Sequence, residues 1–340
     1  TPAQFERIIM TNSSTKYLVT GGTGSIGSEI VRSLLRAGVG HLTVFSRDDS
    51  KHFYLQQELG SRENVRYVIG DIRDRNSLAV AFEENIDVVI HAAALKHVLI
   101  CEQNPTEAVK TNIIGTQNVV DLAKRAKVGK MVTVSTDKAV NPSSTMGASK
   151  YVAEKLTLDG NSTGKTIFSC VRFGNVLGSR GSVIPNMIKG IRDRGVLWVS
   201  DETVTRFAMP IPEAAALVLN AVETCKGGEI IVLKMKTFNL GQLLEVMRGM
   251  EFIKKDFKVE THGVIEAEKT HEELISSEEA GRLWETDTHF VIAPTRGLWE
   301  PSADMRRARV TGYNSQTAEM FTHQELKKKI QECAAFLGIE

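Results

Sequence analysis

The chain has 340 residues, of which 42% are apolar and 24% charged, a composition typical of a globular protein large enough for two domains. Its formal net charge of +1 argues against a nucleic-acid partner, and no apolar run is long enough for a membrane-spanning helix. The four cysteines are far apart and lack metal-ligand spacing, which favours a cytoplasmic protein with reduced thiols and no metal site.

The first predicted unit is a strand, a glycine turn and a helix within residues 16–38, KYLVTGGTGSIGSEIVRSLLRAG. An apolar run precedes three glycines spaced three residues apart, and the apolar stripe of a helix follows them. A turn without Cβ atoms lets backbone N–H groups approach a pyrophosphate at the helix N-terminus. The turn therefore predicts a dinucleotide site built from Gly21, Thr23, Gly24, Ser25, Ile26 and Gly27.

The predicted second strand, residues 41–47, ends in side chains that favour NADP over NAD. NAD binding usually needs an acidic residue here, which bonds the ribose 2′-hydroxyl. In this chain Ser46, Arg47 and Lys51 offer a hydroxyl and two cations that suit a 2′-phosphate. Two aspartates follow Arg47 directly, so NAD remains the alternative.

Further predicted strands alternate with helices along the first half of the chain. Strands are expected within residues 65–74, 86–98, 130–139 and 165–178, and a helix over 108–126. This alternation predicts an α/β fold with a doubly wound, parallel, Rossmann-type sheet, whose ligands lie beyond the carboxyl ends of the strands. The residues expected there are Asp71 and Ile72 beside an adenine, Ala92, Ala93 and Ala94 close to the cofactor, Asn112, Ser135, Thr136, Asp137 and Lys138.

Several motifs together resemble the extended short-chain dehydrogenase/reductase superfamily. More narrowly, they resemble the inverting UDP-N-acetylglucosamine 4,6-dehydratases of bacterial polysaccharide and flagellar-sugar biosynthesis. The motifs cover roughly residues 16–275 and read TGGTGSIG, SRDDSK, GDIRD, HAAALKHV, KTNIIGTQNV, STDKAVNP, MGASK, RFGNVLGSRGSVIP, TRF and EKTHEELIS. The pair STDKA and SRGSVIP is far more specific than the glycine turn.

The resemblance implies a reaction in three steps. Hydride passes from the sugar C4 to the nicotinamide, the C5 proton and the C6 hydroxyl leave as water, and hydride returns to C6 while C5 is reprotonated from the opposite face. Lys138 is assigned as the C5 base, with an amine pKa lowered by burial and by the nicotinamide charge. Asp137 is assigned as the acid for the C6 hydroxyl and as the relay for the C4 proton. Lys150 would bond the nicotinamide ribose, and Thr136 would orient the C4 oxygen.

Met146 occupies a catalytic position where many relatives carry tyrosine. In MGASK it precedes Lys150 by four residues, so the two share one face of a helix. The resemblance includes a branch with methionine here that is regarded as active. A thioether cannot accept a proton, so the hypothesis transfers the phenol's role to Asp137 and Lys138.

The second half of the chain is expected to bind the nucleotide sugar. The resemblance places the UDP-sugar contacts at Lys96, Asn175, Arg180, Ser182, Val183, Arg206 and Glu268. Cations among these suit a diphosphate. Relatives carry Arg-Pro-Gly before the Glu-Lys of this motif, whereas here Ile265 stands at the arginine position and Glu-Ala replaces Pro-Gly, which puts one diphosphate or ribose contact in doubt.

The sequence predicts an NADP-binding domain over residues 1–175 and a smaller lobe over residues 176–340, with some segments returning to the first domain. Resemblance to oligomeric relatives implies a homo-oligomer. Two other functions remain open. One is an NAD(P)-dependent nucleotide-sugar epimerase, and the other is a catalytically silent nucleotide-binding protein that has lost the tyrosine.

Overall fold

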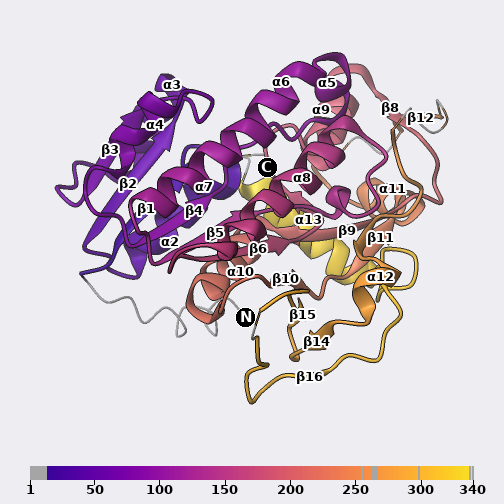
Figure 1. Cartoon of the computed structure of the whole chain (residues 1–340). Coiled ribbons are helices and arrows are strands. Elements are labelled where there is room, and N and C mark those ends of the chain that lie inside the picture. The colour runs from indigo at the N-terminus through magenta and orange to yellow at the C-terminus, as the bar shows by residue number, and fades with distance from the viewer. Residues whose placement is uncertain are drawn as a thin grey trace.

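The computed structural model of the chain describes residues 14–253, 256–261, 263, 267–297, 299–336 and 338. The first half alternates strands and helices along its whole length (Figure 1). Its elements are β1 (Lys16–Thr20), α2 (Ser25–Arg36), β2 (His41–Ser46), α3 (Asp49–Leu59), β3 (Val65–Ile69), α4 (Arg75–Ala79), η1 (Val80–Phe82), β4 (Val88–His91), α5 (Val98–Gln103), α6 (Pro105–Ala108), η2 (Val109–Ile114), α7 (Gly115–Arg125), β5 (Lys130–Val134), η3 (Asp137–Ala139), α8 (Thr145–Asp159), η4 (Gly160–Ser162) and β6 (Ile167–Arg172).

The second half mixes short strands with helices. Its elements are β7 (Asn175–Leu177), α9 (Val183–Arg194), β8 (Val196–Val199), β9 (Thr205–Pro210), α10 (Ile211–Thr224), β10 (Ile230–Leu233), β11 (Thr237–Asn239), α11 (Leu240–Arg248), β12 (Lys258–Thr261), β13 (Glu273–Ile275), α12 (Ser277–Ala280), β14 (Leu283–Glu285), β15 (His289–Ile292), β16 (Arg306–Arg307), β17 (Tyr313–Asn314) and α13 (His323–Phe336). None of the helices in the described part of the chain combines the length and the apolar character needed to cross a bilayer.

One large sheet organises the molecule. Its ten strands follow the order β16-β14-β15-β10-β6-β5-β4-β1-β2-β3. The strands from β3 to β10 run parallel, and β15, β14 and β16 each run antiparallel to their neighbour. Helices α7 and α8 cover one face, and α2 and α10 pack together on the other (Figure 1). The predicted α/β class with a doubly wound parallel sheet is thus confirmed.

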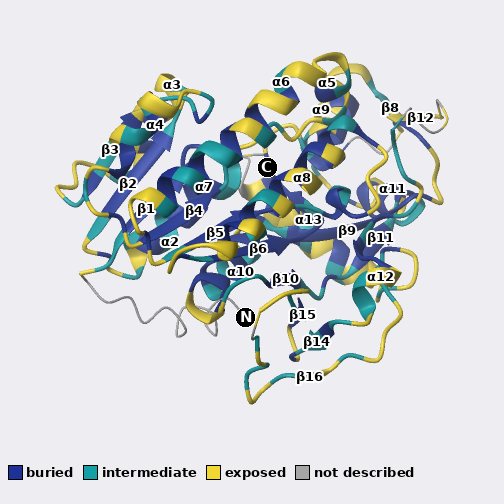
Figure 2. Cartoon of the chain, viewed as in Figure 1, coloured by how far each residue is buried: buried dark blue, intermediate teal, exposed yellow. Residues whose placement is uncertain are grey.

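The buried strands explain why the apolar runs predicted them correctly. The four residues of β4 are all buried, as are four of the five residues of β1 and of β5 (Figure 2). Strands covered by helices on both faces need side chains that leave water on both sides, and they therefore read as continuous apolar runs. The six expected strands lie where the sequence placed them.

The helix expected over residues 108–126 differs in one respect. Residues 109–114 form a π-helix, η2, between α6 and α7. Asn112 lies in this segment, and its side-chain amide makes two hydrogen bonds to the backbone of Leu95. The Leu95 N–H donates to Asn112 Oδ1 at 2.8 Å, and Asn112 Nδ2 donates to the Leu95 carbonyl at 3.0 Å. A π-bulge widens the helix locally, and such bulges often occur at functional sites.

A second apolar core lies within the second half of the chain. It includes side chains of α9, β8, α11 and α13, among them Ile188, Leu197, Leu243 and Leu326, which are at most 4% exposed. Strands β10, β14, β15 and β16 of the second half instead extend the main sheet. The second half of the chain therefore builds both a separate core and one end of the sheet.

Candidate active site

The glycine turn leaves no room for side chains. Gly21 has a φ of +68°, and a Cβ there would lie 2.7 Å from the backbone nitrogen of Ala93. A Cβ on Gly27 would lie 2.2 Å from the carbonyl oxygen of Gly21. Helix α2 begins at Ser25, directly after this turn. The turn and the helix N-terminus therefore form a cradle of backbone groups that fits the pyrophosphate of a dinucleotide.

Arg180 lies over this turn. Its guanidinium donates a hydrogen bond to the Thr23 carbonyl at 2.5 Å, and its backbone N–H donates to Ser25 Oγ at 3.1 Å. Lys96, from the segment after β4, donates to Ser179 Oγ at 3.3 Å. Burial and the neighbouring Arg180 lower the pKa of Lys96. Arg180 was predicted for the UDP moiety, whereas its contacts bring it to the glycine turn.

The end of β2 presents Arg47 next to Asp71. The side chain of Arg47 is 55% exposed, and its guanidinium lies 3.9 Å from the Asp71 carboxylate. Asp71 is held by Arg73, at 2.7 and 3.0 Å. Ser46 Oγ accepts a hydrogen bond from Thr23 Oγ1 at 2.8 Å, which ties the glycine turn to the strand end. Arg47 is therefore the accessible cation beside the expected ribose position.

Lys51, the second predicted cation, has a local partner. Its ammonium pairs with Asp48, whose carboxylate also accepts the Lys51 backbone N–H and so caps α3. The hydrogen bonds to Lys51 lower the pKa of Asp48. Much of the Lys51 charge is thus compensated by Asp48.

Asn112, Lys150 and Ser135 lie deep beside the carboxyl ends of β4 and β5. The Asn112 amide, besides its two bonds to Leu95, donates to Ser149 Oγ at 2.9 Å. It therefore links the segment after β4 to α8, and its contact with the cofactor stays a prediction. Lys150 donates to the Val134 carbonyl at 2.7 Å, and burial lowers its pKa. Ser135 Oγ is buried and has no hydrogen-bond partner among the described residues.

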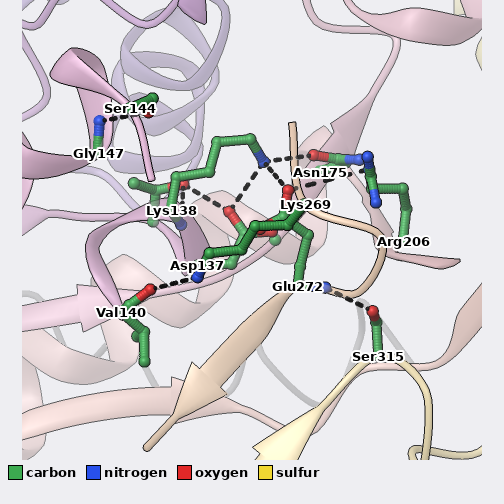
Figure 3. A network of polar contacts seen from close by, with 12 residues as sticks. Asp137, Lys138, Val140, Ser144, Gly147, Asn175, Arg206, Lys269, Glu272 and Ser315 are labelled. Carbon is green, nitrogen blue, oxygen red and sulfur yellow. Dashed lines mark hydrogen bonds and ion pairs between the residues drawn. The ribbon is translucent and has the colours of Figure 1, made fainter. Parts of the chain in front are cut away.

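The main polar cluster lies just past β5, in the turn η3 (Figure 3). Asp137 is fully buried, and its Oδ1 accepts from Thr136 Oγ1 at 2.7 Å and from Lys138 Nζ at 3.1 Å. Lys138 Nζ also lies 3.3 Å from Asn175 Oδ1 and 3.3 Å from Glu272 Oε1. The second oxygen of each carboxylate, Asp137 Oδ2 and Glu272 Oε2, is buried without a hydrogen-bond partner among the described residues.

The charge of Lys138 differs from the expectation. Burial disfavours the ammonium, but the two carboxylates of Asp137 and Glu272 outweigh it, so the pKa of Lys138 is raised rather than lowered. The prediction of a lowered pKa did not include Glu272, which comes from a distant part of the chain. Lys138 is therefore a cation in the structure described here.

The cluster opens into a cavity of about 340 Å³. Lys138, Asn175, Arg206 and Glu272 line it together with apolar side chains and the segment 267–269; the other lining residues are Val98, Leu99, Ser143, Ser144, Val183, Met187, Trp198, Val199, Ser200, Val204, Phe238 and Leu240. Its size and its mix of apolar walls with a few convergent polar groups suit a small organic ligand.

Several residues predicted to bind the nucleotide sugar meet at this cavity. Arg206 donates to Glu268 Oε1 at 2.7 Å, and its Nε lies 3.9 Å from Glu272 Oε1. Val183, the first residue of α9, lines the wall, and Ser182 Oγ before it is buried without a hydrogen-bond partner among the described residues. Ile265, the departure from the family pattern, lies outside the described residues.

Met146 does not line the cavity. It is 3% exposed and packs with Cys101 and Ala108, and Leu95 and Val98 adjoin this cluster. Position 146 is thus part of an apolar contact between α8 and the helices after β4.

Two residues that the sequence analysis did not single out belong to the site. Glu272 completes the surroundings of Lys138, and Lys269 donates to the Val140 carbonyl at 2.7 Å while lining the cavity. Both lie in EKTHEELIS, a motif that carried the resemblance, and its density of charged residues was the signal available. In the described part of the chain no group of His, Cys, Asp and Glu side chains could hold a metal ion.

Comparisons with known proteins identify the family to which this chain is similar. A family model described as "Polysaccharide biosynthesis protein" matches residues 17–294. An "Uncharacterized membrane protein MJ1061" of Methanocaldococcus jannaschii is 44% identical over 323 residues, which are 93% of this chain and 95% of that protein. A "UDP-N-acetylglucosamine 4,6-dehydratase (inverting)" of Campylobacter jejuni is 38% identical over 295 residues, 84% of this chain and 85% of its own.

Other similar proteins carry different names. A "UDP-glucose 4-epimerase" of Rickettsia bellii is 38% identical over 282 residues, which cover 81% of this chain and 82% of the epimerase. Among solved structures, Pen from Bacillus thuringiensis is 39% identical, with a TM-score of 0.89 over 95% of this chain and 99% of that chain.

Proposed function

The chain belongs to the polysaccharide biosynthesis protein family, and from this membership and the site geometry we propose that it is a UDP-N-acetylglucosamine 4,6-dehydratase that inverts C5. The observation that carries the proposal is the pairing of Asp137 with Lys138 at 3.1 Å beside the cavity. A dehydratase needs an acid and a base at one sugar, and this pair supplies both without a phenol.

The reaction divides between a dinucleotide and the side chains of this chain. A nicotinamide dinucleotide, held by the glycine turn, would supply the hydride chemistry between C4 and C6. Asp137 accepts the proton of the C4 hydroxyl during oxidation and later gives it to the departing C6 hydroxyl, which leaves as water. Lys138 removes the C5 proton, which the C4 ketone has made acidic, and the opposite face of C5 is reprotonated.

The nucleotide part of the substrate is proposed to bind along the cavity wall. Arg206 supplies a planar cation for a diphosphate, and Glu268 beside it accepts from hydroxyl groups. Binding of a diphosphate would compete with the 2.7 Å bond between Arg206 and Glu268. Asn175 and Val183 also line this cavity and would contact the sugar and the nucleotide. Lys96 bonds Ser179, and Arg180 bonds the Thr23 carbonyl in the glycine turn.

NADP is the proposed dinucleotide. The exposed guanidinium of Arg47 at the end of β2 suits a 2′-phosphate, and the predicted acidic partner for a 2′-hydroxyl is absent at its position. Asp48 would be that acid for NAD, but it caps α3 and pairs with Lys51.

The assay is incubation of the full chain and cofactor with UDP-N-acetylglucosamine, followed by NMR of the sugar. We expect a 4-keto-6-deoxy product with inverted C5. A product changed only at C4, with the C6 hydroxyl retained, would establish the epimerase instead. Binding without turnover would favour the silent nucleotide-binding protein.

A further inference from the structure

Glu272 lies in the cluster but has no part in the reaction as proposed above. It enters just before β13, from a segment far along the chain from Asp137 and Lys138. Ser315 makes two hydrogen bonds to the Glu272 backbone. The Glu272 N–H donates to Ser315 Oγ at 2.8 Å, and the Ser315 N–H donates to the Glu272 carbonyl at 2.8 Å. These bonds fix the backbone from which the buried Glu272 carboxylate reaches Lys138, and the charge of Lys138 offsets part of the cost of burying that carboxylate.

The proposed mechanism has to assign an acceptor for the ammonium proton of Lys138. Lys138 must be neutral to take the C5 proton, yet it lies as an ammonium between two carboxylates. Asp137 cannot take the ammonium proton, because by that step it already holds the proton of the C4 hydroxyl. Another acceptor within hydrogen-bond reach is required.

We propose that Glu272 is this acceptor and that it is a positioning residue acting through Lys138. Its Oε1 lies 3.3 Å from Lys138 Nζ, and its Oε2 is buried, lacks a hydrogen-bond partner among the described residues, and belongs to a side chain that lines the cavity. The inference rests on the proposed function.

The proton balance closes with Glu272 included. In the first step the C4 proton moves to Asp137. The ammonium proton of Lys138 then moves to Glu272, and the freed amine takes the C5 proton while Asp137 gives its proton to the departing C6 oxygen. C5 is then reprotonated on its opposite face from solvent, Lys138 keeps the proton that it removed and is again the ammonium, and Glu272 releases its proton to solvent. Asp137, Lys138 and Glu272 end in their starting charge states.

The groups that face Lys138 define what a change at Glu272 would do. Asp137 precedes it in the same turn, Glu272 approaches from the segment before β13, and Arg206 of β9 disfavours the ammonium. Arg206 is itself paired with Glu268, and Lys269 bonds the Val140 carbonyl. Removal of the Glu272 charge therefore leaves Asp137 alone to favour the ammonium of Lys138.

The test compares wild type, Glu272→Gln and Glu272→Asp, with Glu273→Gln as the matched control. The Glu273 side chain accepts from Asn141 at 2.6 Å and does not line the cavity. In Glu272→Gln, kcat should fall about 10²-fold near neutral pH, with KM unchanged, because an amide cannot take the proton. The deficit should shrink as pH rises, since the amine then loses its proton to solvent. Glu272→Asp should recover much of the loss.

A direct titration gives a readout that is independent of turnover. With ¹⁵N-labelled lysine, the Nζ signal of Lys138, identified by its loss in Lys138→Ala, should titrate at lower pH in Glu272→Gln than in wild type. The same titration in both proteins would overturn the proposal, as would a kcat deficit that is constant with pH or equal in Glu272→Gln and Glu272→Asp. A wild type that titrates as expected but forms no 4-keto-6-deoxy product would refute the proposed function while leaving the charge control of Lys138 by Glu272 established.

Discussion

Met146 and Lys150 lie one turn apart on α8, and their side chains meet different neighbours. Met146 packs against Cys101 and Ala108, whereas Lys150 donates to the Val134 carbonyl at 2.7 Å. The position at which the resemblance implied a phenol is here enclosed by apolar side chains. The proposed reaction therefore takes its proton acceptor from Asp137, which precedes Lys138 in η3.

Substitution at Met146 should affect folding more than chemistry. Met146→Ala should cost about 2–5 kcal/mol of unfolding free energy, because it leaves a cavity, while folded molecules keep their turnover. Met146→Tyr should overpack the apolar cluster and so lower the free energy of unfolding by about 1–3 kcal/mol, while turnover stays unchanged or falls. Denaturant unfolding and turnover per folded molecule measure both, with Met146→Leu as the volume-conserving control. A rise in turnover by orders of magnitude in Met146→Tyr would show that the wild-type site lacks an acceptor.

The Asp137–Lys138 pair divides the reaction into separable steps. Lys138→Ala should abolish deuterium uptake at C5 from heavy water, because no amine remains to exchange that proton. Asp137→Asn should block both the oxidation at C4 and the loss of water from C6, because an amide can neither accept the C4 hydroxyl proton nor donate the acid proton. NMR of the sugar reports both events, and the exposed Lys165→Ala serves as control. Normal C5 exchange in Lys138→Ala would move the base to another residue.

Arg47 should decide the choice between dinucleotides. Arg47→Ala removes a charge-assisted contact worth about 1.5–3 kcal/mol with a 2′-phosphate, so NADP should weaken much more than NAD. Lys51→Ala should have a smaller effect, since Asp48 already pairs with Lys51. Titration calorimetry with both dinucleotides measures the difference. Equal weakening of NADP and NAD by Arg47→Ala would exclude the 2′-phosphate contact.

His91 should make the fold less stable in acid. It is buried at the end of β4, bonded to Thr20 Oγ1 at 2.7 Å and Thr116 Oγ1 at 3.0 Å, and burial followed by the charge of Lys150 lowers its pKa to about 3. Between its ordinary value of 6.5 and about 3, only the unfolded chain binds this proton. The contribution is therefore full above pH 6.5 and declines below it, by at most about 1.4 kcal/mol per pH unit.

Unfolding by denaturant at several pH values tests this effect of His91. His91→Gln should be less stable at neutral pH, but its stability should fall less steeply with acid than that of wild type. The same pH slope in both proteins would assign the acid sensitivity to other groups.

Arg172 should be the most sensitive buried position. It is 1% exposed at the end of β6 and bonds Glu154 of α8 at 2.7 and 2.8 Å and Glu279 of α12 at 2.8 and 2.9 Å. Arg172→Met should cost about 3–5 kcal/mol of unfolding free energy, because it leaves buried carboxylates unpaired. Adding Glu154→Gln should recover part of that loss. Denaturant unfolding measures both, and a purely additive double variant would mean that the groups act independently.

The sequence predicted those features that depend on local pattern. The buried strands followed from apolar runs, and the glycine turn followed from spacing that only a tight backbone approach requires. The grouping of Asp137 and Lys138 beside the strand ends followed from the rule that ligands bind at that edge of a parallel sheet. Each of these inferences needed only neighbouring residues and the order of elements.

Features that depend on distant segments were missed. Glu272 reaches Lys138 through the path of the chain before β13, and no local pattern encodes that approach. The raised pKa of Lys138 was missed for the same reason, since it depends on a second carboxylate. The bond from Arg180 to the Thr23 carbonyl also depends on a distant segment, the one after β7, while its contact with the nucleotide sugar stays a prediction.

The place of β6 in the sheet has a consequence for how the protein is made. One edge of β6 pairs with β5, and the other edge pairs with β10, a strand from the second half of the chain. While the ribosome has synthesised only the first half, β6 presents an open row of backbone donors and acceptors, the kind of edge on which nascent chains aggregate. The parallel pairing of β10 with β6 therefore forms only after residues 230–233 have left the exit tunnel. A chain stalled before that point keeps one edge of β6 unpaired.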